Sequence, residues 1–143
     1  MLMGEYAHAL DDKGRLIVPS RLREDLKERF VVTKGLDNCL FCYPLEEWSR
    51  IVARLRELPL TNANARAFTR TFLAGAQEVE LDKQGRVTIA PRLREYASIE
   101  REVTLVGVMN RVEIWAQDVW TTYQERSQAS LGEVAETLGD FGF

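Results

Sequence analysis

The chain has 143 residues, 45% of them hydrophobic, and a formal net charge of −3. This length suits one compact domain or two tightly fused half-domains, and the apolar content excludes a disordered chain. No apolar segment follows a basic start, and no apolar run approaches the ~18 residues of a membrane helix, so we expect a soluble, cytoplasmic protein.

The first predicted elements surround a short polar loop. Residues 7–10 form an extended run, and residues 11–14, Asp-Asp-Lys-Gly, are typical of a hairpin loop. Aspartate favours the first position of a turn, and glycine tolerates the positive φ that closes it. Residues 16–18 are predicted as the returning strand, and Pro19 then fits the entry to a helix.

A short helix and a pair of strands are predicted next. Leu22, Leu26 and Phe30 recur at intervals of four and form a helical stripe. Residues 30–33 and 39–43 are rich in β-branched and aromatic side chains, which predicts two strands.

Two longer helices are predicted in the middle of the chain. Residues 46–58 form the first, which ends before Pro59. Residues 61–64, Thr-Asn-Ala-Asn, are a connector rich in helix-capping side chains. Residues 66–74 form the second helix, and Gly75 ends it.

The second half of the chain repeats the first. Residues 10–23 return as residues 81–94, and Gly14 is echoed by Gly85, 71 positions later. The short strands of either half would not be stable alone, so we expect the two copies to interlock around one core. The last predicted elements are a helix from Asp118, a helix over 131–138 and a tail over 139–143.

The charge distribution differs from the net charge. Residues 10–23 hold four basic and two acidic side chains, a charge of +2, and residues 81–94 hold four and one, a charge of +3. Since the whole chain carries −3, the remainder carries −8. Binding to a polyanion depends on the local field over one face, so an acidic body with two basic loops remains compatible with nucleic-acid binding.

The two Asp-x-x-x-Arg loops, each followed by an apolar strand, a proline and a short helix, resemble the MraZ family, and residues 4–19 are an especially close match. The resemblance implies a mainly β fold with α (α+β), in which two SpoVT-AbrB-type units interlock. It predicts a pseudo-two-fold, double-psi or swapped-hairpin AbrB-like β-barrel with peripheral helices. The units are expected at 5–47 and 76–119, with a helical connector over 48–75 and C-terminal helices and a tail over 120–143.

The same resemblance implies a function. Proteins of this family are transcriptional regulators that bind direct repeats in the promoter of the division and cell-wall gene cluster, their own gene included, and that assemble into closed rings. We therefore expect double-stranded DNA and further copies of the chain as partners, at the nucleoid. Enzymatic activity, a cofactor, a metal ion, a small-molecule substrate and a membrane are not expected.

The resemblance carries DNA binding onto particular residues. Arg15 and Arg86 are the motif arginines, and arginine pairs bidentately with guanine O6 and N7 in the major groove. Lys13 and Lys83 flank them and suit phosphate contact, which positions the protein without reading sequence. Four arginines near the predicted helix starts leave two interpretations open, phosphate contact or a solvated helix face: Arg21, Arg23, Arg92 and Arg94.

Other residues of the motif are expected to shape the loops. Asp11 and Asp82 suit turn positions that need a side-chain acceptor for backbone N–H groups, and Gly14 and Gly85 suit the closing position. The second copy departs from the family pattern, because Gln84 replaces an acidic residue and the proline shifts by one. This departure predicts an unequal contribution from the second loop.

Alternative functions receive less support. The two motif aspartates could be imagined as a catalytic pair, but neighbouring arginines would keep them ionised. Cys39 and Cys42 suggest a metal or redox site, yet in a strand residues i and i+3 point to opposite faces, which favours structural or reduced surface thiols. The aromatic residues have spacings typical of a core or a subunit interface rather than a stacking platform. A protein-interaction scaffold of the same fold, of the antitoxin-like kind, stays open as the alternative.

Overall fold

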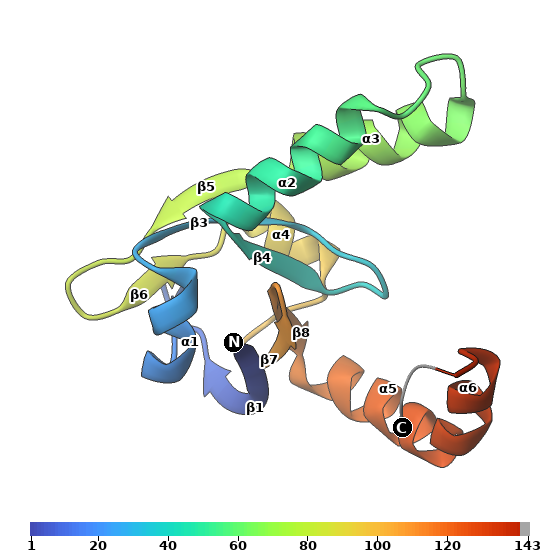
Figure 1. The fold of residues 1–143 in the computed structure, drawn as a ribbon. Helices are drawn as coiled ribbons and strands as arrows, with labels where there is room; N and C mark the ends of the chain where they lie inside the picture. The colour runs from blue at the N-terminus through green and yellow to red at the C-terminus, as the bar shows by residue number, and fades with distance from the viewer. Residues whose placement is uncertain (141–143) are drawn as a thin grey trace.

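The computed structural model describes residues 1–140; the last three residues of the predicted tail, 141–143, lie outside the described part. Strands and helices follow one another in the same order in both halves, and two helices end the chain (Figure 1). The elements are β1 (Leu2–Ala9), β2 (Arg15–Ile17), α1 (Ser20–Leu26), β3 (Arg29–Lys34), β4 (Leu40–Pro44), α2 (Leu45–Arg56), α3 (Ala63–Gly75), β5 (Gln77–Glu80), β6 (Arg86–Thr88), α4 (Pro91–Tyr96), β7 (Glu102–Met109), β8 (Val112–Ala116), α5 (Gln117–Ala129) and α6 (Leu131–Thr137).

The strands form one large antiparallel sheet and one small ribbon. The sheet has six strands in the order β1-β7-β8-β4-β3-β5, and the ribbon consists of β2 and β6 alone. Within the described residues the sheet has open edges at β1 and β5, so the closed barrel predicted from the sequence does not form. β2 and β6 are three residues long and pair only with each other, so they do not join the two edges.

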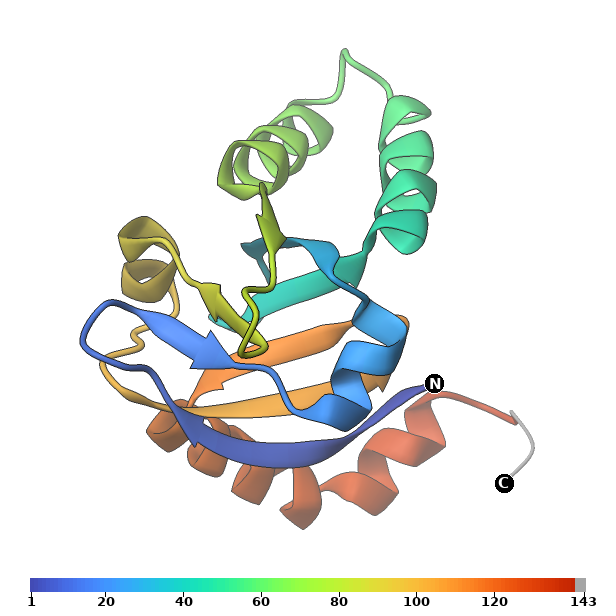
Figure 2. The same ribbon diagram turned by 90° about the vertical axis from the view of Figure 1, so that its left-hand side faces the viewer.

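Each half of the chain completes its strands with partners from the other half. β1 pairs with β7 over its whole length, β5 pairs with β3, and β2 pairs with β6. The hairpin predicted around residues 11–14 is therefore wrong, although the loop itself is closed by hydrogen bonds. The strands on either side of this loop, β1 and β2, do not pair with each other, because each pairs with a strand of the other repeat. Figure 2 shows β2 beside β6.

The two faces of the sheet pack against different layers. Side chains alternate along β4, so that Leu40 and Cys42 join the main core while Phe41 and Tyr43 face an aromatic cluster. The main core lies between the sheet and the ribbon with its short helices. The aromatic cluster lies under α2, α3 and α5 and includes the buried residues Phe72 and Trp115, which confirms the core interpretation for these two aromatics.

The helical stripe predicted after Pro19 is too long. α1 ends at Leu26, and Lys27 has φ of 67°, which stops the helix. Phe30 lies in β3 and is fully buried there. An aromatic residue four positions after a leucine fits the interior of a strand as well as the next turn of a helix, and the left-handed residue between them decides the outcome.

Two helical arms project from the sheet. α2 and α3 form one, and α5 and α6 form the other (Figure 1). The connector rich in capping residues acts as predicted, since the side chain of Asn62 accepts a hydrogen bond from the N–H of Ala65 at 3.0 Å. α3 consequently starts at Ala63, three residues before the predicted start.

Candidate functional site

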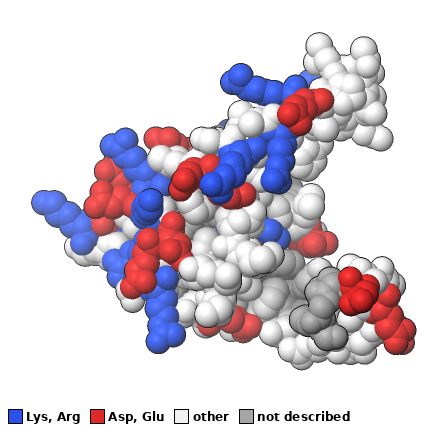
Figure 3. Space-filling view, in the orientation of Figure 1, with Lys and Arg blue, Asp and Glu red and all other residues white. Residues whose placement is uncertain are grey.

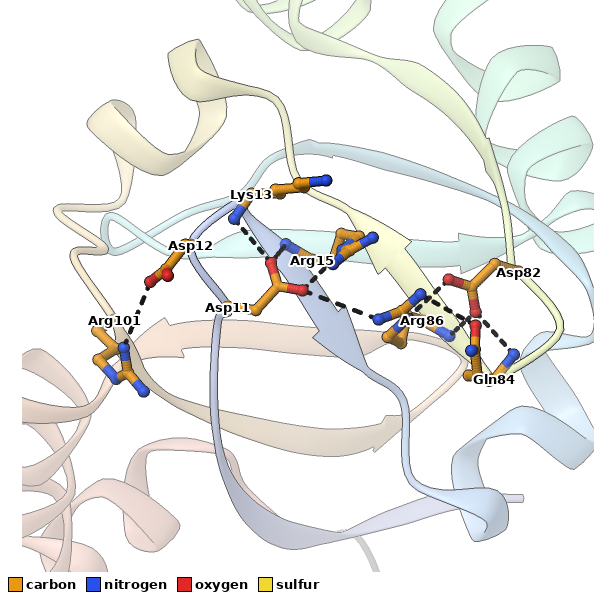
Figure 4. A network of polar contacts seen from close by, with 8 residues as sticks. All are labelled: Asp11, Asp12, Lys13, Arg15, Asp82, Gln84, Arg86 and Arg101. Carbon is orange, nitrogen blue, oxygen red and sulfur yellow. Dashed lines mark hydrogen bonds and ion pairs between the residues drawn. The ribbon is translucent and has the colours of Figure 1, made fainter.

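The first Asp-x-x-x-Arg loop is organised around one carboxylate. Asp11 Oδ1 accepts hydrogen bonds from the N–H groups of Lys13 and Arg15, both at 2.9 Å (Figure 4). Asp11 Oδ2 accepts a bond from Arg15 Nε at 2.6 Å. The N–H of Gly14 donates to the Asp11 carbonyl at 3.0 Å and closes the turn. One aspartate thus fixes both the backbone of the loop and the direction of its arginine.

The second loop repeats this arrangement with the predicted residues. Asp82 Oδ1 accepts from the N–H groups of Gln84 at 2.9 Å and Arg86 at 2.8 Å, and Oδ2 accepts from Arg86 Nε at 2.8 Å. The N–H of Gly85 donates to the Asp82 carbonyl at 3.0 Å. The role assigned to the two aspartates, shaping the loops, is consistent with these bonds.

The ribbon brings the two arginines to one surface. Leu16 lies opposite Val87 in the pairing of β2 with β6, and both point into the core. Side chains alternate along a strand, so the residues on either side of this buried pair all face outward. This outward face consists of Arg15, Ile17, Arg86 and Thr88.

Ile17 is a surface residue that the sequence reasoning did not single out. Its side chain is 48% exposed, although isoleucine is normally buried in a strand. It lies directly opposite Arg86 in the ribbon and two residues from Arg15. The signal was the alternation itself: if Leu16 and Val18 point inward, Ile17 must point outward.

The guanidinium groups of Arg15 and Arg86 differ in the number of their polar contacts. Arg86 donates from Nη2 to Gln84 Oε1 at 2.9 Å, and its Nη1 lies 4.0 Å from Asp11 Oδ2. Of the three side-chain nitrogens of Arg15, only Nε has a partner among residues 1–140. Both terminal nitrogens of Arg15 are therefore available to an external ligand, whereas those of Arg86 must first exchange partners. The unequal contribution predicted for the second loop concerns base reading and stays a prediction.

The loop carboxylates are held in their anionic form. The hydrogen bond from the backbone of Arg15 is the main reason why the pKa of Asp11 falls from 3.8 to about 2. The pKa of Asp82 is lowered for the same reason by the backbone of Arg86. A carboxylic acid that donates a proton near neutral pH needs a raised pKa instead, so the pair does not suit general acid catalysis.

The other predicted basic residues divide into two groups. Lys13, Lys83, Arg21 and Arg92 are exposed, whereas Arg23 and Arg94 are partly buried. A fully solvated helix face, one of the two interpretations for these arginines, therefore does not describe Arg23 and Arg94. Figure 3 shows basic and acidic residues intermixed at the end of the molecule that carries the β5–β6 loop, so no continuous basic face covers this view.

One further basic residue lies beside the first loop. Arg101 Nη1 is 3.9 Å from Asp12 Oδ1, and both side chains are exposed. No sequence motif includes Arg101, and only the folding of the second half against the first brings it here (Figure 4).

The cysteines do not form a reactive pair. Cys39 and Cys42 are both free and buried, and they belong to the two different clusters on opposite faces of the sheet. Opposite faces were predicted, but the surface location considered for these thiols is wrong. Burial raises the pKa of both, which disfavours the reactive thiolate. In residues 1–140 no group of three or more potential ligands is placed to hold a metal ion.

No helix in the described part of the chain is both long and apolar enough to cross a bilayer.

Fold and site together define a two-unit protein that presents a duplicated, aspartate-braced arginine loop on one surface. Comparison with known proteins agrees with this class: the model of the family described as "MraZ protein, putative antitoxin-like" matches residues 1–71 and again residues 72–142. Proteins named transcriptional regulator MraZ are 58% identical over 140 residues in Thermoanaerobacter sp. (strain X514) and 56% identical over 141 residues in Caldanaerobacter subterraneus subsp. tengcongensis. The matches cover 98% and 99% of both chains, respectively. The chain belongs to the MraZ family, whose members are transcriptional regulators rather than enzymes.

Proposed function

We propose that this transcriptional regulator binds double-stranded DNA sequence-specifically through its two Asp-x-x-x-Arg loops. The observation that carries the proposal is that Arg15 and Arg86 share the outward face of one two-stranded ribbon, each braced through Nε by its own aspartate. The major groove of B-DNA admits a two-stranded β-ribbon, and arginine reads guanine there by bidentate hydrogen bonds.

The bracing suits this chemistry. Asp11 fixes Arg15 at Nε and leaves its terminal nitrogens to pair with a base edge. An arginine that is already ordered loses less conformational entropy on binding. Ile17, exposed beside both arginines, supplies an apolar group of the kind that contacts a thymine methyl.

Phosphate contacts complete the proposed interface. Lys13 and Lys83 extend from the two loops and, within residues 1–140, have no side-chain partner. Neutralising a phosphate with lysine adds affinity for any sequence and releases a counterion, so binding should weaken as salt rises. Arg21 and Arg92 are exposed on α1 and α4, the short helices that follow the ribbon strands, and suit the same role.

Binding by a single copy should be weak. The chain is acidic overall and offers two short loops, so we propose that copies assemble into a closed ring that engages direct promoter repeats. For protomers on one side of the duplex these repeats recur about every 10 base pairs. Linking several contacts raises avidity by on the order of 10²–10⁴. The apolar surface proposed for assembly is the helical one around Trp48, Phe68, Phe72 and Trp120. Of these residues, Phe68 is 43% exposed, whereas Phe72 is buried below the surface and packs against Phe68.

The remaining parts of the proposal follow from the family. The target is the promoter of the division and cell-wall gene cluster, including the protein's own gene, and the protein acts in the cytoplasm at the nucleoid. Two loop-bearing units, 5–47 and 76–119, are joined by the helical segment 48–75 and followed by 120–143.

The deciding experiment is a titration of the full chain onto DNA from upstream of its own gene. Fluorescence anisotropy should give tighter binding to this DNA than to a scrambled duplex of equal length, and tighter binding to three repeats than to one. Light scattering on the same sample should show an oligomer. Equal affinity for both duplexes would reject sequence-specific binding. It would favour the alternative, a scaffold for a protein partner, in line with the antitoxin-like description of the family.

A further inference from the structure

Arg94 packs against the loop of the other repeat. Its guanidinium carbon lies 3.1 Å from the point that a β-carbon on Gly14 would occupy. Arg94 Nε donates a hydrogen bond to the Ile89 carbonyl at 3.1 Å, and the N–H of Ile89 donates to the Gly14 carbonyl at 2.9 Å. A side chain on α4 is thus connected by packing and by two hydrogen bonds to the turn that precedes Arg15.

Arg23 makes the reciprocal contact. Its guanidinium carbon lies 2.9 Å from the point that a β-carbon on Gly85 would occupy, and its Nη1 lies closer still. The N–H of Val18 donates to the Gly85 carbonyl at 3.0 Å. Within the described residues Arg23 Nε is buried without a hydrogen-bond partner, so the second contact lacks the carbonyl anchor of the first.

The two glycines are suited to these contacts. Gly14 and Gly85 have φ of 74° and 75°, a conformation that side chains disfavour, and both are buried. A β-carbon at either position would both strain the turn and displace the guanidinium. The crossed arrangement occurs twice in one chain with every participant offset by 71 residues, so it is a property of the repeat rather than an isolated contact.

We propose that Arg94 and Arg23 are positioning residues: each holds the loop of the opposite repeat in the conformation that presents its motif arginine. This inference rests on the proposed function for its consequence in DNA binding, but not for the positioning itself. It replaces both interpretations that the sequence left open for these two arginines, phosphate contact and a solvated helix face. It makes the shape of each loop depend on a helix from the other half of the chain.

The neighbouring arginines provide matched controls. Arg92 and Arg21 lie two residues away on the same short helices and are exposed. Replacing them removes the same charge from the same helix without touching a glycine. A difference between Arg94→Ala and Arg92→Ala therefore reports the contact and not the net charge.

The positioning is tested without DNA, by amide hydrogen exchange followed by NMR. Arg94→Ala should speed exchange at Gly14 and Arg15 by about tenfold or more, while Gly85 and Arg86 keep their rates. Arg23→Ala should give the reverse pattern with a smaller change, because its contact lacks the carbonyl anchor. Amides of the sheet core, such as Leu105, should not change in either variant. Faster exchange throughout the protein, or no change in either loop, would overturn the proposal.

Arg94→Lys separates positioning from phosphate contact. Lysine keeps the charge but loses the planar guanidinium that packs on the glycine. It should therefore loosen the first loop as Arg94→Ala does, and it serves in place of that variant if alanine prevents folding. Suppose instead that Arg94→Ala weakens DNA binding without changing the amide exchange rates of the first loop, and that Arg94→Lys binds DNA like the wild type. Arg94 is then a phosphate contact and the inference is wrong.

Operator binding then tests the two proposals separately. If the loops read DNA, Arg94→Ala and Arg94→Lys should both weaken binding to the promoter DNA by about tenfold, and Arg92→Ala should weaken it less. If exchange shows the crossed pattern but all variants bind DNA like the wild type, the positioning holds and the assignment of DNA reading to the loops fails.

Discussion

Arg86 lies within ion-pair distance of Asp11, the aspartate of the other loop: its Nη1 is 4.0 Å from Asp11 Oδ2. Asp11 therefore faces two arginines, Arg15 and Arg86, whereas Asp82 braces Arg86 alone. This ion pair links the two loops electrostatically, and within residues 1–140 no reciprocal ion pair joins Arg15 to Asp82.

This asymmetry predicts that Asp11→Asn weakens promoter binding more than Asp82→Asn. Asparagine keeps the size of the side chain but removes the charge that orients both arginines. Anisotropy titrations of the two variants check the order. Asp12→Asn is the control, since Asp12 is fully exposed and lies outside the brace; equal losses in all three variants would contradict the prediction.

Loss of the motif arginines should reduce specificity. Arg15→Ala should cost about 1–3 kcal/mol at the cognate site and flatten the difference from random DNA, with a smaller cost for Arg86→Ala. Lys13→Ala should instead weaken cognate and random DNA alike and lower the salt slope by about one unit. Titrations over a range of salt concentrations distinguish these patterns. Wild-type binding by both arginine variants would disprove the assignment of the loops.

Two adjacent ribbon residues should separate stability from binding. Leu16 is fully buried, so Leu16→Ala should cost about 2–5 kcal/mol in the free energy of unfolding. Ile17→Ala should change stability by no more than about 0.5 kcal/mol because the side chain is at the surface, yet it should weaken promoter binding. Urea denaturation and DNA titration of both variants measure the two effects. Unchanged promoter binding by Ile17→Ala would remove this residue from the interface.

Acid should destabilise the protein partly through its loops. The folded-state pKa of Asp11 is about 2, below its ordinary 3.8, so the ionised form is favoured by folding. The resulting stability is present above pH ~4 and is lost as the pH falls toward 2. The double variant Asp11→Asn, Asp82→Asn should lose less stability than the wild type across this range. Urea midpoints at several pH values provide the measurement, and parallel curves would contradict it.

The thiols should be inert while the protein is folded. Cys39 and Cys42 are buried on opposite faces of the sheet, so a thiol reagent should react with both only on unfolding. Chelator and reductant should leave the melting temperature and DNA binding unchanged, and the double serine variant should fold. Stoichiometric zinc that is lost on chelation together with the fold would overturn this prediction.

The sequence predicted what local rules determine. The turn at Gly14 and the capping connector over 61–64 were predictable because each depends on residues within a few positions. The 71-residue repeat was visible directly, when the chain is compared with itself. Strand partners were not readable in the same way. β1 pairs with β7, about a hundred residues further along the chain, and only the tertiary fold determines that pairing.

The same reason explains why the contact made by Arg94 was not predicted. Arg94 looks like any exposed helix arginine until the second half of the chain is folded against the first, where it meets Gly14. Phe30 was counted both in the helical stripe and in the strand predicted over 30–33, because an interval of four does not distinguish a further helical turn from a new strand; the strand is confirmed as β3. Sequence reasoning identified the loops, but not the residues that connect them.

The covalent fusion of the two units gives the ribbon a polarity. In a symmetric dimer of identical half-length chains, any change in one loop is imposed on the other. Here the residues between aspartate and glycine differ, Asp12-Lys13 in one loop and Lys83-Gln84 in the other. The two ends of the ribbon surface are consequently different. Reversing the orientation of this surface along a duplex would exchange the loop that faces a given base. If the loops bind DNA as proposed, this polarity would let the protein distinguish a site from the same site in the reversed orientation.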